Sequence, residues 1–308
     1  MAGPLVRVGS RGSQLALRQT EQVVAALQRF HPGLEFRVCP VRTEGDRRAR
    51  APLSLIGGQG MFVRELEARL AAGEVDLAVH SLKDVPTELA PGLTLAAVPA
   101  REDPRDALVS RGGVRLAELP AGARVGTGSA RRAVQARASR PDLEYVDIRG
   151  NVDTRLRRVR EGSVDAVIVA AAGLARLGRL GEAAEALDPE VMLPAAGQGA
   201  LAVEARAEDG ELCGLIAPLE DRETRAAAEA ERAFLRRLGG GCRLPVGALG
   251  EVKGPTLRLR ALIADGRGER ILREEMSDRL EEAEALGTRL AEGLLALGAA
   301  EFMAESLR

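Results

Sequence analysis

The sequence predicts an α/β protein made of two α/β domains and a small C-terminal α+β domain. Two patterns support this fold class. Over the first two thirds of the chain, short apolar runs alternate with segments of helical period, which is the order of parallel βαβ units. The last third contains a helix, three strand-like runs and a long amphipathic helix. With 308 residues, the chain has room for two or three domains of about 100 to 150 residues each.

The first domain is expected to alternate strands and helices. Strands are predicted at 5–8, 36–39 and 76–79, and helices begin near Ser13 and Met61. The polar segment 42–60 ends in Gly-Gly-Gln-Gly and has neither helical nor strand period. We therefore expect a mobile loop over a cleft there.

A second set of elements follows the segment AREDPRDA at 100–107. Its predicted strands are 107–110, 124–125, 144–148 and 166–170, with helices after Ser129 and Asn151. A return strand is expected within 197–206, so that two crossing segments would form a hinge. The C-terminal domain is predicted as a helix at 221–238, strands at 246–249, 257–263 and 270–275, and a helix at 278–297. The expected domains are 1–99 with 200–217, 100–199, and 218–308.

Composition argues against several classes of protein. The net charge is −1, and the chain has no tryptophan, one tyrosine and five phenylalanines, which disfavours a nucleic-acid partner. The longest uncharged apolar run, 166–175, is well short of the roughly 20 residues that span a bilayer. Three cysteines without CxxC spacing and two histidines fit neither a disulfide framework nor a metal cluster. We expect a soluble cytoplasmic protein without a metal.

Arginines and hydroxyl side chains gather where predicted strands end and helices begin. Of 44 Lys and Arg residues, only Lys83 and Lys253 are lysine. Helix N-termini bind anions, whereas cations in a first helical turn oppose the macrodipole unless an anion is present. Because turns at the carboxyl ends of parallel strands share one rim, we expect a cleft for several carboxylates or phosphates. An ordinary capped turn remains the alternative at Ser13. The side chains concerned are Arg11, Ser13, Thr127, Ser129, Arg131, Arg132, Arg149, Arg155 and Arg176.

Two further positions carry chemistry. Lys83 and Asp84 come just after the strand 76–79, where a carboxylate among arginines would stay ionised and could stabilise a developing cation. A turn with a Lys83–Asp84 salt bridge is the alternative. Cys242 follows three glycines in a loop between a helix and a strand, so a modified or nucleophilic cysteine is at least as well supported as an inert one.

Taken together, these segments resemble the porphobilinogen deaminase family from about residue 5 to residue 250. The matching motifs occur in the family's order. They are RVGSRGSQLAL, GGQGMFVRELE, HSLKDVPTELAPGL, REDPRDA, VGTGSARR, DIRGNVDTRL, LPAAGQGALAVE and GGGCRLPVG. The resemblance implies two domains folded like type II periplasmic binding proteins around a cleft, a third domain with the cofactor loop, and a cytoplasmic monomer.

The resemblance also implies the chemistry. A dipyrromethane cofactor would be attached to Cys242 by a thioether, and four porphobilinogen molecules would be added with loss of ammonia before hydrolysis releases hydroxymethylbilane. Asp84 would be the catalytic carboxylate. Cofactor and substrate carboxylates would be bound by Arg11, Ser13, Ser81, Lys83, Thr127, Ser129, Arg131, Arg132, Arg149, Arg155 and Arg176.

The sequence departs from the family's pattern in three places. Gly128 stands where relatives commonly have serine, Leu55 and Gln59 replace frequent lysines, and Gly239 adds a third glycine before Cys242. The absent lysines put any ionic role of 42–60 in doubt. A two-domain anion-binding or sensor protein without catalysis is the alternative function, although it does not explain Cys242 or a third domain.

Overall fold

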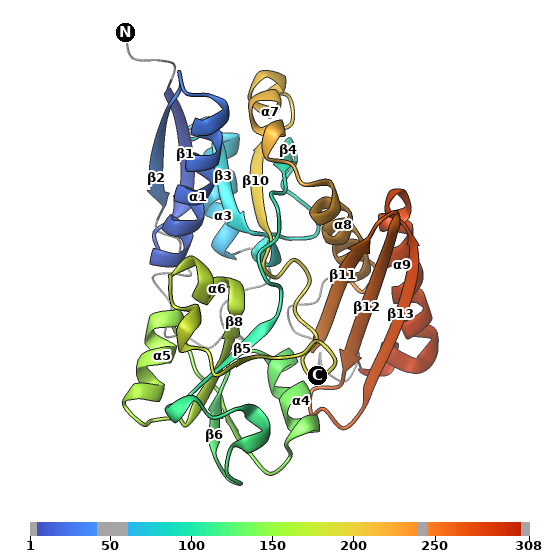
Figure 1. The fold of residues 1–308 in the computed structure, drawn as a ribbon. Helices are drawn as coiled ribbons and strands as arrows, with labels where there is room; N and C mark the ends of the chain where they lie inside the picture. The colour runs from blue at the N-terminus through green and yellow to red at the C-terminus, as the bar shows by residue number, and fades with distance from the viewer. Residues whose placement is uncertain (1–4, 42–60, 240–244, 303–308) are drawn as a thin grey trace. The chain divides into compact units, whose positions relative to one another are not determined.

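The structure is a computed structural model that describes residues 5–41, 61–239 and 245–302 (Figure 1). The chain divides into two compact units. Unit 1 comprises Met1–Glu102 and Ala200–Arg225, and unit 2 comprises Asp103–Gly199 and Ala226–Arg308. No helix in the described ranges is long and apolar enough to cross a membrane.

Unit 1 is built on one mixed sheet with the order β2-β1-β3-β10-β4. β1 (Leu5–Arg11) pairs in parallel with β2 (Glu35–Val41) and β3 (Leu77–Ser81). The returning strand β10 (Leu201–Arg206) runs antiparallel between β3 and β4 (Leu93–Ala97). The chain thus enters this sheet from two distant parts of the sequence.

Helices cover both faces of this sheet because its strands are apolar on both sides. On one face, α1 (Gln14–Phe30) and α7 (Gly210–Ile216) pack through Leu27 and Ile216 against a cluster that includes Val79 and Val203. On the other face, α3 (Met61–Ala71) packs through Leu66 and Leu70 against Ala78. These two cores fix the strand ends from which the site residues project.

Unit 2 contains a second mixed sheet with the equivalent order β7-β6-β8-β5-β9. Its strands are β5 (Asp106–Ser110), β6 (Arg124–Gly126), β7 (Glu144–Val146), β8 (Ala166–Ala170) and β9 (Glu185–Ala186). β6 is parallel to β7 and β8, whereas β5 is antiparallel to β8 and β9. Three helices accompany this sheet, α4 (Ala130–Ser139), α5 (Val152–Arg160) and α6 (Ala171–Arg176).

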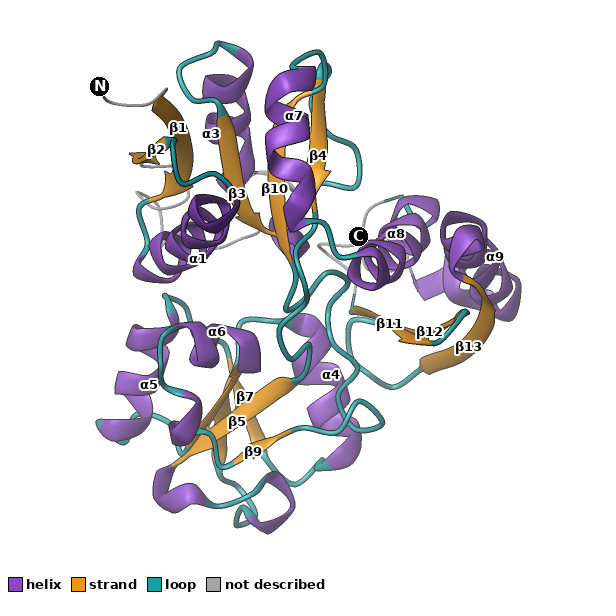
Figure 2. Ribbon diagram, turned by 45° about the horizontal axis from the view of Figure 1, so that its top comes forward, coloured by secondary structure: helices purple, strands orange, loops and turns teal. Residues whose placement is uncertain are grey.

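A smaller antiparallel sheet completes unit 2 in the order β11-β12-β13. Its strands are β11 (Val246–Lys253), β12 (Thr256–Ala264) and β13 (Ile271–Arg279). Figure 2 shows α8 (Arg222–Arg237) and α9 (Ala283–Leu294) on one face of it. Their buried residues share a core with Leu259 and Ile263. A Cβ built on Gly287 of α9 would lie 2.1 Å from the Ala230 carbonyl oxygen of α8, so the two helices pack too closely for a side chain at that position.

The predicted fold class is confirmed, because two similar α/β sheets are followed by a small sheet with helices. The start of the last helix was predicted wrongly, because β13 continues to Arg279 and the helix begins at Ala283 rather than 278. Strand β4 was not predicted, although Leu93 and Leu95 alternate after a Pro-Gly turn, and β9, α6 and α7 were also missed. The expected loop at 42–60 lies outside the described residues.

Candidate functional site

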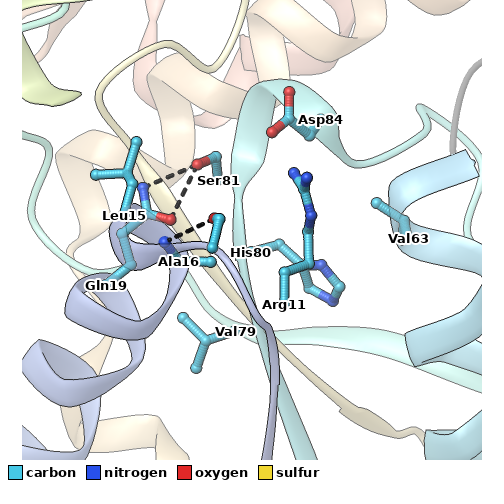
Figure 3. Close-up of a pocket in the computed structure, with 10 residues that line it drawn as sticks. Arg11, Leu15, Ala16, Gln19, Val63, Val79, His80, Ser81 and Asp84 are labelled. Carbon is cyan, nitrogen blue, oxygen red and sulfur yellow. Dashed lines mark hydrogen bonds between the residues drawn. The ribbon is translucent and has the colours of Figure 1, made fainter. Parts of the chain in front are cut away.

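A pocket in unit 1 gathers side chains from β1, α1, α3, β3 and the turn after β3 (Figure 3). Arg11, Ser13, Ser81 and Asp84, four residues predicted from the sequence, line this pocket. The other lining residues are Leu15, Ala16, Gln19, Val63, Val79 and His80. Figure 3 shows the Arg11 guanidinium extending toward the Asp84 carboxylate.

Strand ends and helix starts place these groups. β1 ends at Arg11, and Ser13 caps α1 by accepting a hydrogen bond from the Ala16 amide at 3.3 Å. β3 ends at Ser81, and a short 3₁₀ turn (Leu82–Asp84) carries Lys83 and Asp84, both exposed. The Leu82 amide donates to the Ala200 carbonyl at 3.0 Å, which ties this turn to the residue before β10. The pocket therefore lies where parallel strands end, as such sites do in open α/β sheets.

Gln19 is a site residue that the sequence argument missed. Its side chain is buried, and its amide lies 2.8 Å from the Ser81 hydroxyl, an interaction drawn in Figure 3. Its neighbour Thr20 donates to the Ser10 hydroxyl at 2.8 Å. These buried contacts fix α1 against the ends of β1 and β3. The sequence signal that could have identified Gln19 is the polar pair Gln19 and Thr20 on the face of α1 that is otherwise apolar and turned toward the core.

Arg131 and Arg132 are at the start of α4 in unit 2, and both are buried. Each guanidinium lies 2.7 Å from the carboxylate of Asp106, whose side chain is fully buried. Gln198 Nε2 donates to the same carboxylate at 2.9 Å. Burial alone would raise the pKa of Asp106, but the two guanidiniums hold it well below its usual range. The anion that these helix-start cations require is thus present in the protein itself.

The positive charges of Arg149 and Arg155 are only partly balanced by nearby carboxylates. Arg149 pairs with Asp147 at 3.2 Å, and Arg155 Nε donates to the Gly150 carbonyl at 2.9 Å. Burial lowers the pKa of Arg155 to about 10, and repulsion from Arg132 and Arg149 adds to this effect. A half-buried cation held near other cations favours binding of an anion.

The remaining predicted groups of unit 2 lie at strand and helix ends. Ser129 caps α4 by accepting from the Arg132 amide at 3.4 Å, and Thr127 Oγ1 accepts from the Ser129 amide at 3.2 Å. Arg176, at the end of α6, donates to the Gly199 carbonyl at 2.6 Å. A Cβ on Gly128 would lie 2.7 Å from the Ile148 carbonyl oxygen, so this backbone leaves no room for a serine at that position.

Several predicted residues cannot be placed. Cys242, Leu55 and Gln59 lie outside the described residues. Asp106 and Gln198 were missed as site residues, although Asp106 opens an apolar strand, a position where a charge needs a partner. Among the described residues, no group of three His, Cys, Asp or Glu side chains could hold a metal.

Two family models match almost the whole chain. Residues 6–213 match "Porphobilinogen deaminase, dipyromethane cofactor binding domain", and residues 226–296 match "Porphobilinogen deaminase, C-terminal domain". A protein named porphobilinogen deaminase from Roseiflexus sp. (strain RS-1) is 52% identical to this chain, and the match covers 96% of this chain and 98% of that protein. A protein of the same name from Syntrophus aciditrophicus is 50% identical, and the match covers 94% of this chain and 95% of that protein.

Among solved structures, the periplasmic VFT2 domain of Bordetella pertussis BvgS is 20% identical with a TM-score of 0.41, covering 70% of this chain and 86% of that one. The probable amino-acid ABC transporter extracellular-binding protein ytmK from Bacillus subtilis is 11% identical, also with a TM-score of 0.41, and the match covers 70% of this chain and 90% of that chain.

Proposed function

The chain belongs to the porphobilinogen deaminase family, and we propose that Asp84 is its catalytic carboxylate and that its clustered arginines bind the carboxylates of cofactor and substrate. The enzyme joins four porphobilinogen molecules, with loss of ammonia, onto a covalently bound dipyrromethane cofactor and releases hydroxymethylbilane by hydrolysis. The alternative of a binding protein without catalysis is therefore wrong.

One observation carries the proposal for Asp84. Its carboxylate is exposed in a pocket that Arg11 also lines. Asp84 follows the end of β3, a strand that is paired on both sides, with β1 and with β10. Loss of ammonia leaves positive charge on a pyrrole ring, which a fixed carboxylate stabilises more than it stabilises the neutral ring. Arg11 and the capped start of α1 supply the cation and the helix N-terminus that hold a substrate carboxylate.

The arginines of unit 2 fit a polycarboxylate cofactor. Arg155 is half-buried near two other arginines, with Asp147 as the single nearby carboxylate that raises its pKa. Arg149 and Arg155 are proposed to bind cofactor and substrate carboxylates, together with Arg132 beside them. When bound, the dipyrromethane supplies the pyrrole carbon to which each new ring is joined. The residues proposed to hold the cofactor are Ser13, Ser81, Lys83, Thr127, Ser129, Arg131, Arg132, Arg149 and Arg155, and Arg11 and Arg176 are proposed to bind substrate.

Cys242 is proposed as the attachment point. Burial raises the pKa of the Cys213 thiol, which disfavours the thiolate that forms a thioether. Intact mass of the purified protein should show a two-ring adduct, and the Cys242→Ser variant should have the bare sequence mass. A peptide map that places the adduct on Cys39 or Cys213 would overturn this assignment.

Kinetics of Asp84→Asn test the catalytic assignment. The cofactor-loaded variant should turn over about a hundredfold more slowly or worse, because one preorganised electrostatic group is lost. Asp84→Glu keeps the charge and should retain more activity. Glu88→Gln, a few residues further along, is the matched control and should behave like the parent. If folded, cofactor-loaded Asp84→Asn turned over at the parental rate, Asp84 would be a turn residue without a catalytic role.

We also propose that the chain folds into three domains, 1–99 with 200–217, 100–199, and 218–308, and acts as a cytoplasmic monomer. Separate cores in the two units and in the β11-β12-β13 sheet support three folding regions. Size-exclusion chromatography with light scattering tests the monomer.

A further inference from the structure

Three titratable side chains are buried together beside the unit 1 pocket, and none has a part in the reaction as proposed above. They are Glu67 on α3, His80 on β3 and Glu204 on β10. His80 Nε2 lies 3.1 Å from Glu204 Oε2, and the two side chains expose 2% and 0% of their surface. One carboxylate oxygen of Glu67 and one of Glu204 are buried without a hydrogen-bond partner among the described residues. A purely structural core would pair these atoms or replace them.

Strand register explains why these groups meet. In the β3–β10 pair, His80 is opposite Ala202 and Glu204 is opposite Ala78. Residues two apart on a strand share a face, so His80 and Glu204 are on the face that α3 covers. Glu67 lies one turn along α3 from Val63, which lines the pocket together with His80. The three residues therefore adjoin the pocket, and His80 is followed directly by the segment that carries Ser81, Lys83 and Asp84.

The charges of the cluster depend on where its protons are. Burial raises the pKa of Glu67, and the negative charge of Glu204 raises it further, against opposing effects of His80 and Arg64. A protonated Glu67 adds no charge to this buried cluster, whereas its ionisation would add one negative charge to the interior. The charged side chains that act on Glu67 or line the adjoining pocket include Arg64 on α3, Arg11 at the end of β1 and Asp84 after β3.

A buried negative charge beside the pocket would oppose its function. Arg11 is placed to attract a substrate carboxylate, and an anion on the inner side would weaken that attraction. The His80–Glu204 pair also links β3 to β10 next to the turn whose Leu82 amide is held by Ala200. We propose that Glu67, His80 and Glu204 form a positioning cluster that fixes the turn bearing Asp84 and limits the negative charge on the inner side of the pocket. This inference rests on the proposed role of the pocket.

Steady-state kinetics across pH separate this role from simple packing. KM of the parent should rise with pH as Glu67 loses its proton, whereas Glu67→Gln, which mimics the protonated acid, should show a flatter KM profile. Glu204→Gln replaces the carboxylate that faces His80 and should lower kcat about tenfold, because it weakens the contact that holds β3 to β10 beside the turn bearing Asp84. Glu204→Asp should recover part of that loss. Glu74→Gln is the control, because Glu74 follows α3 and is exposed.

The outcomes distinguish failure of this inference from failure of the site. If cofactor-loaded Glu67→Gln and the parent share one KM profile, or if Glu204→Gln has parental kcat, the cluster is only structural and the inference is wrong. If Glu204→Gln does not fold, the Glu67→Gln profile decides alone, because that change keeps the shape of the side chain. If Arg11→Leu and Asp84→Asn are also without effect, the pocket itself is misassigned.

Discussion

Replacing Asp106 by asparagine should destabilise unit 2 strongly while leaving its shape almost unchanged. The carboxylate accepts from Arg131 Nη1 at 2.7 Å, from Arg132 Nε at 2.9 Å and from Gln198 Nε2 at 2.9 Å, and its side chain is fully buried. The two arginine side chains are themselves only 6% and 8% exposed. The Asp106→Asn variant would therefore leave two cations in the interior without a counter-charge, and an amide offers them one acceptor in place of two.

The size of the effect follows from this burial. Removal of one partner of a buried ion pair costs about 3 to 5 kcal/mol. At about 2 to 4 °C per kcal/mol for a domain of this size, the midpoint of thermal unfolding should fall by roughly 6 to 20 °C. Because typical stabilities are about 5 to 15 kcal/mol, the variant should still fold at low temperature. Asp142→Asn is the matched control, since Asp142 meets Arg140 at the same 2.7 Å but is exposed, and its loss should be much smaller.

The pH dependence gives an independent check. The pKa of Asp106 is held below its usual range in the folded protein, so its contribution is complete above the unfolded value of about 3.9 and is lost as pH falls through the folded value. The difference in stability between parent and variant should thus be constant near neutral pH and shrink in acid. Urea unfolding of both proteins at several pH values measures it. A loss no larger than that of Asp142→Asn, or one equally large in strong acid, would refute the argument.

Two further changes test other parts of unit 2. Arg155→Leu should impair cofactor assembly without lowering the stability of the cofactor-free protein, because it removes a cation that neighbouring arginines repel, and intact mass together with thermal unfolding measures both effects. Gly287→Ala should cost about 1 to 3 kcal/mol in urea unfolding, since its Cβ would meet the Ala230 carbonyl at 2.1 Å, and a neutral result would contradict the close packing of α8 on α9.

Local chemistry made much of this fold predictable. Ser129 and Asn151 were expected to begin helices, and each side chain accepts a hydrogen bond from an amide three residues later. Such caps depend on neighbours in sequence. β9, by contrast, is two residues long and exists because Glu185 and Ala186 pair with β5, a contact between distant segments that periodicity does not reveal.

In the candidate site, too, some residues could be predicted from the local sequence and others could not. Arg11, Ser13 and Asp84 follow strands or begin a helix, so their arrival at one pocket could be predicted from the βαβ order. The partner of Arg131 and Arg132 could not, because Asp106 is 25 and 26 residues away from them in sequence. The macrodipole argument correctly required an anion at that helix start, but it could not distinguish a ligand from a carboxylate of the chain itself.

The carboxylate of Asp106 does not balance every arginine near the start of α4. Asp106 balances one of the two arginines that it contacts, and Asp147 is shared between Arg149, its ion-pair partner, and the more distant Arg155. These four arginines therefore outnumber the two carboxylates, and repulsion from Arg132 and Arg149 adds to the burial that lowers the pKa of Arg155. A carboxylate ligand would relieve such an excess by accepting charge-assisted hydrogen bonds from the guanidiniums, which a chloride ion or a water molecule would do less well in a half-buried setting. Asp106 thus orders Arg131 and Arg132, and the uncompensated charge that remains is what we propose a carboxylate-rich pyrrole chain binds.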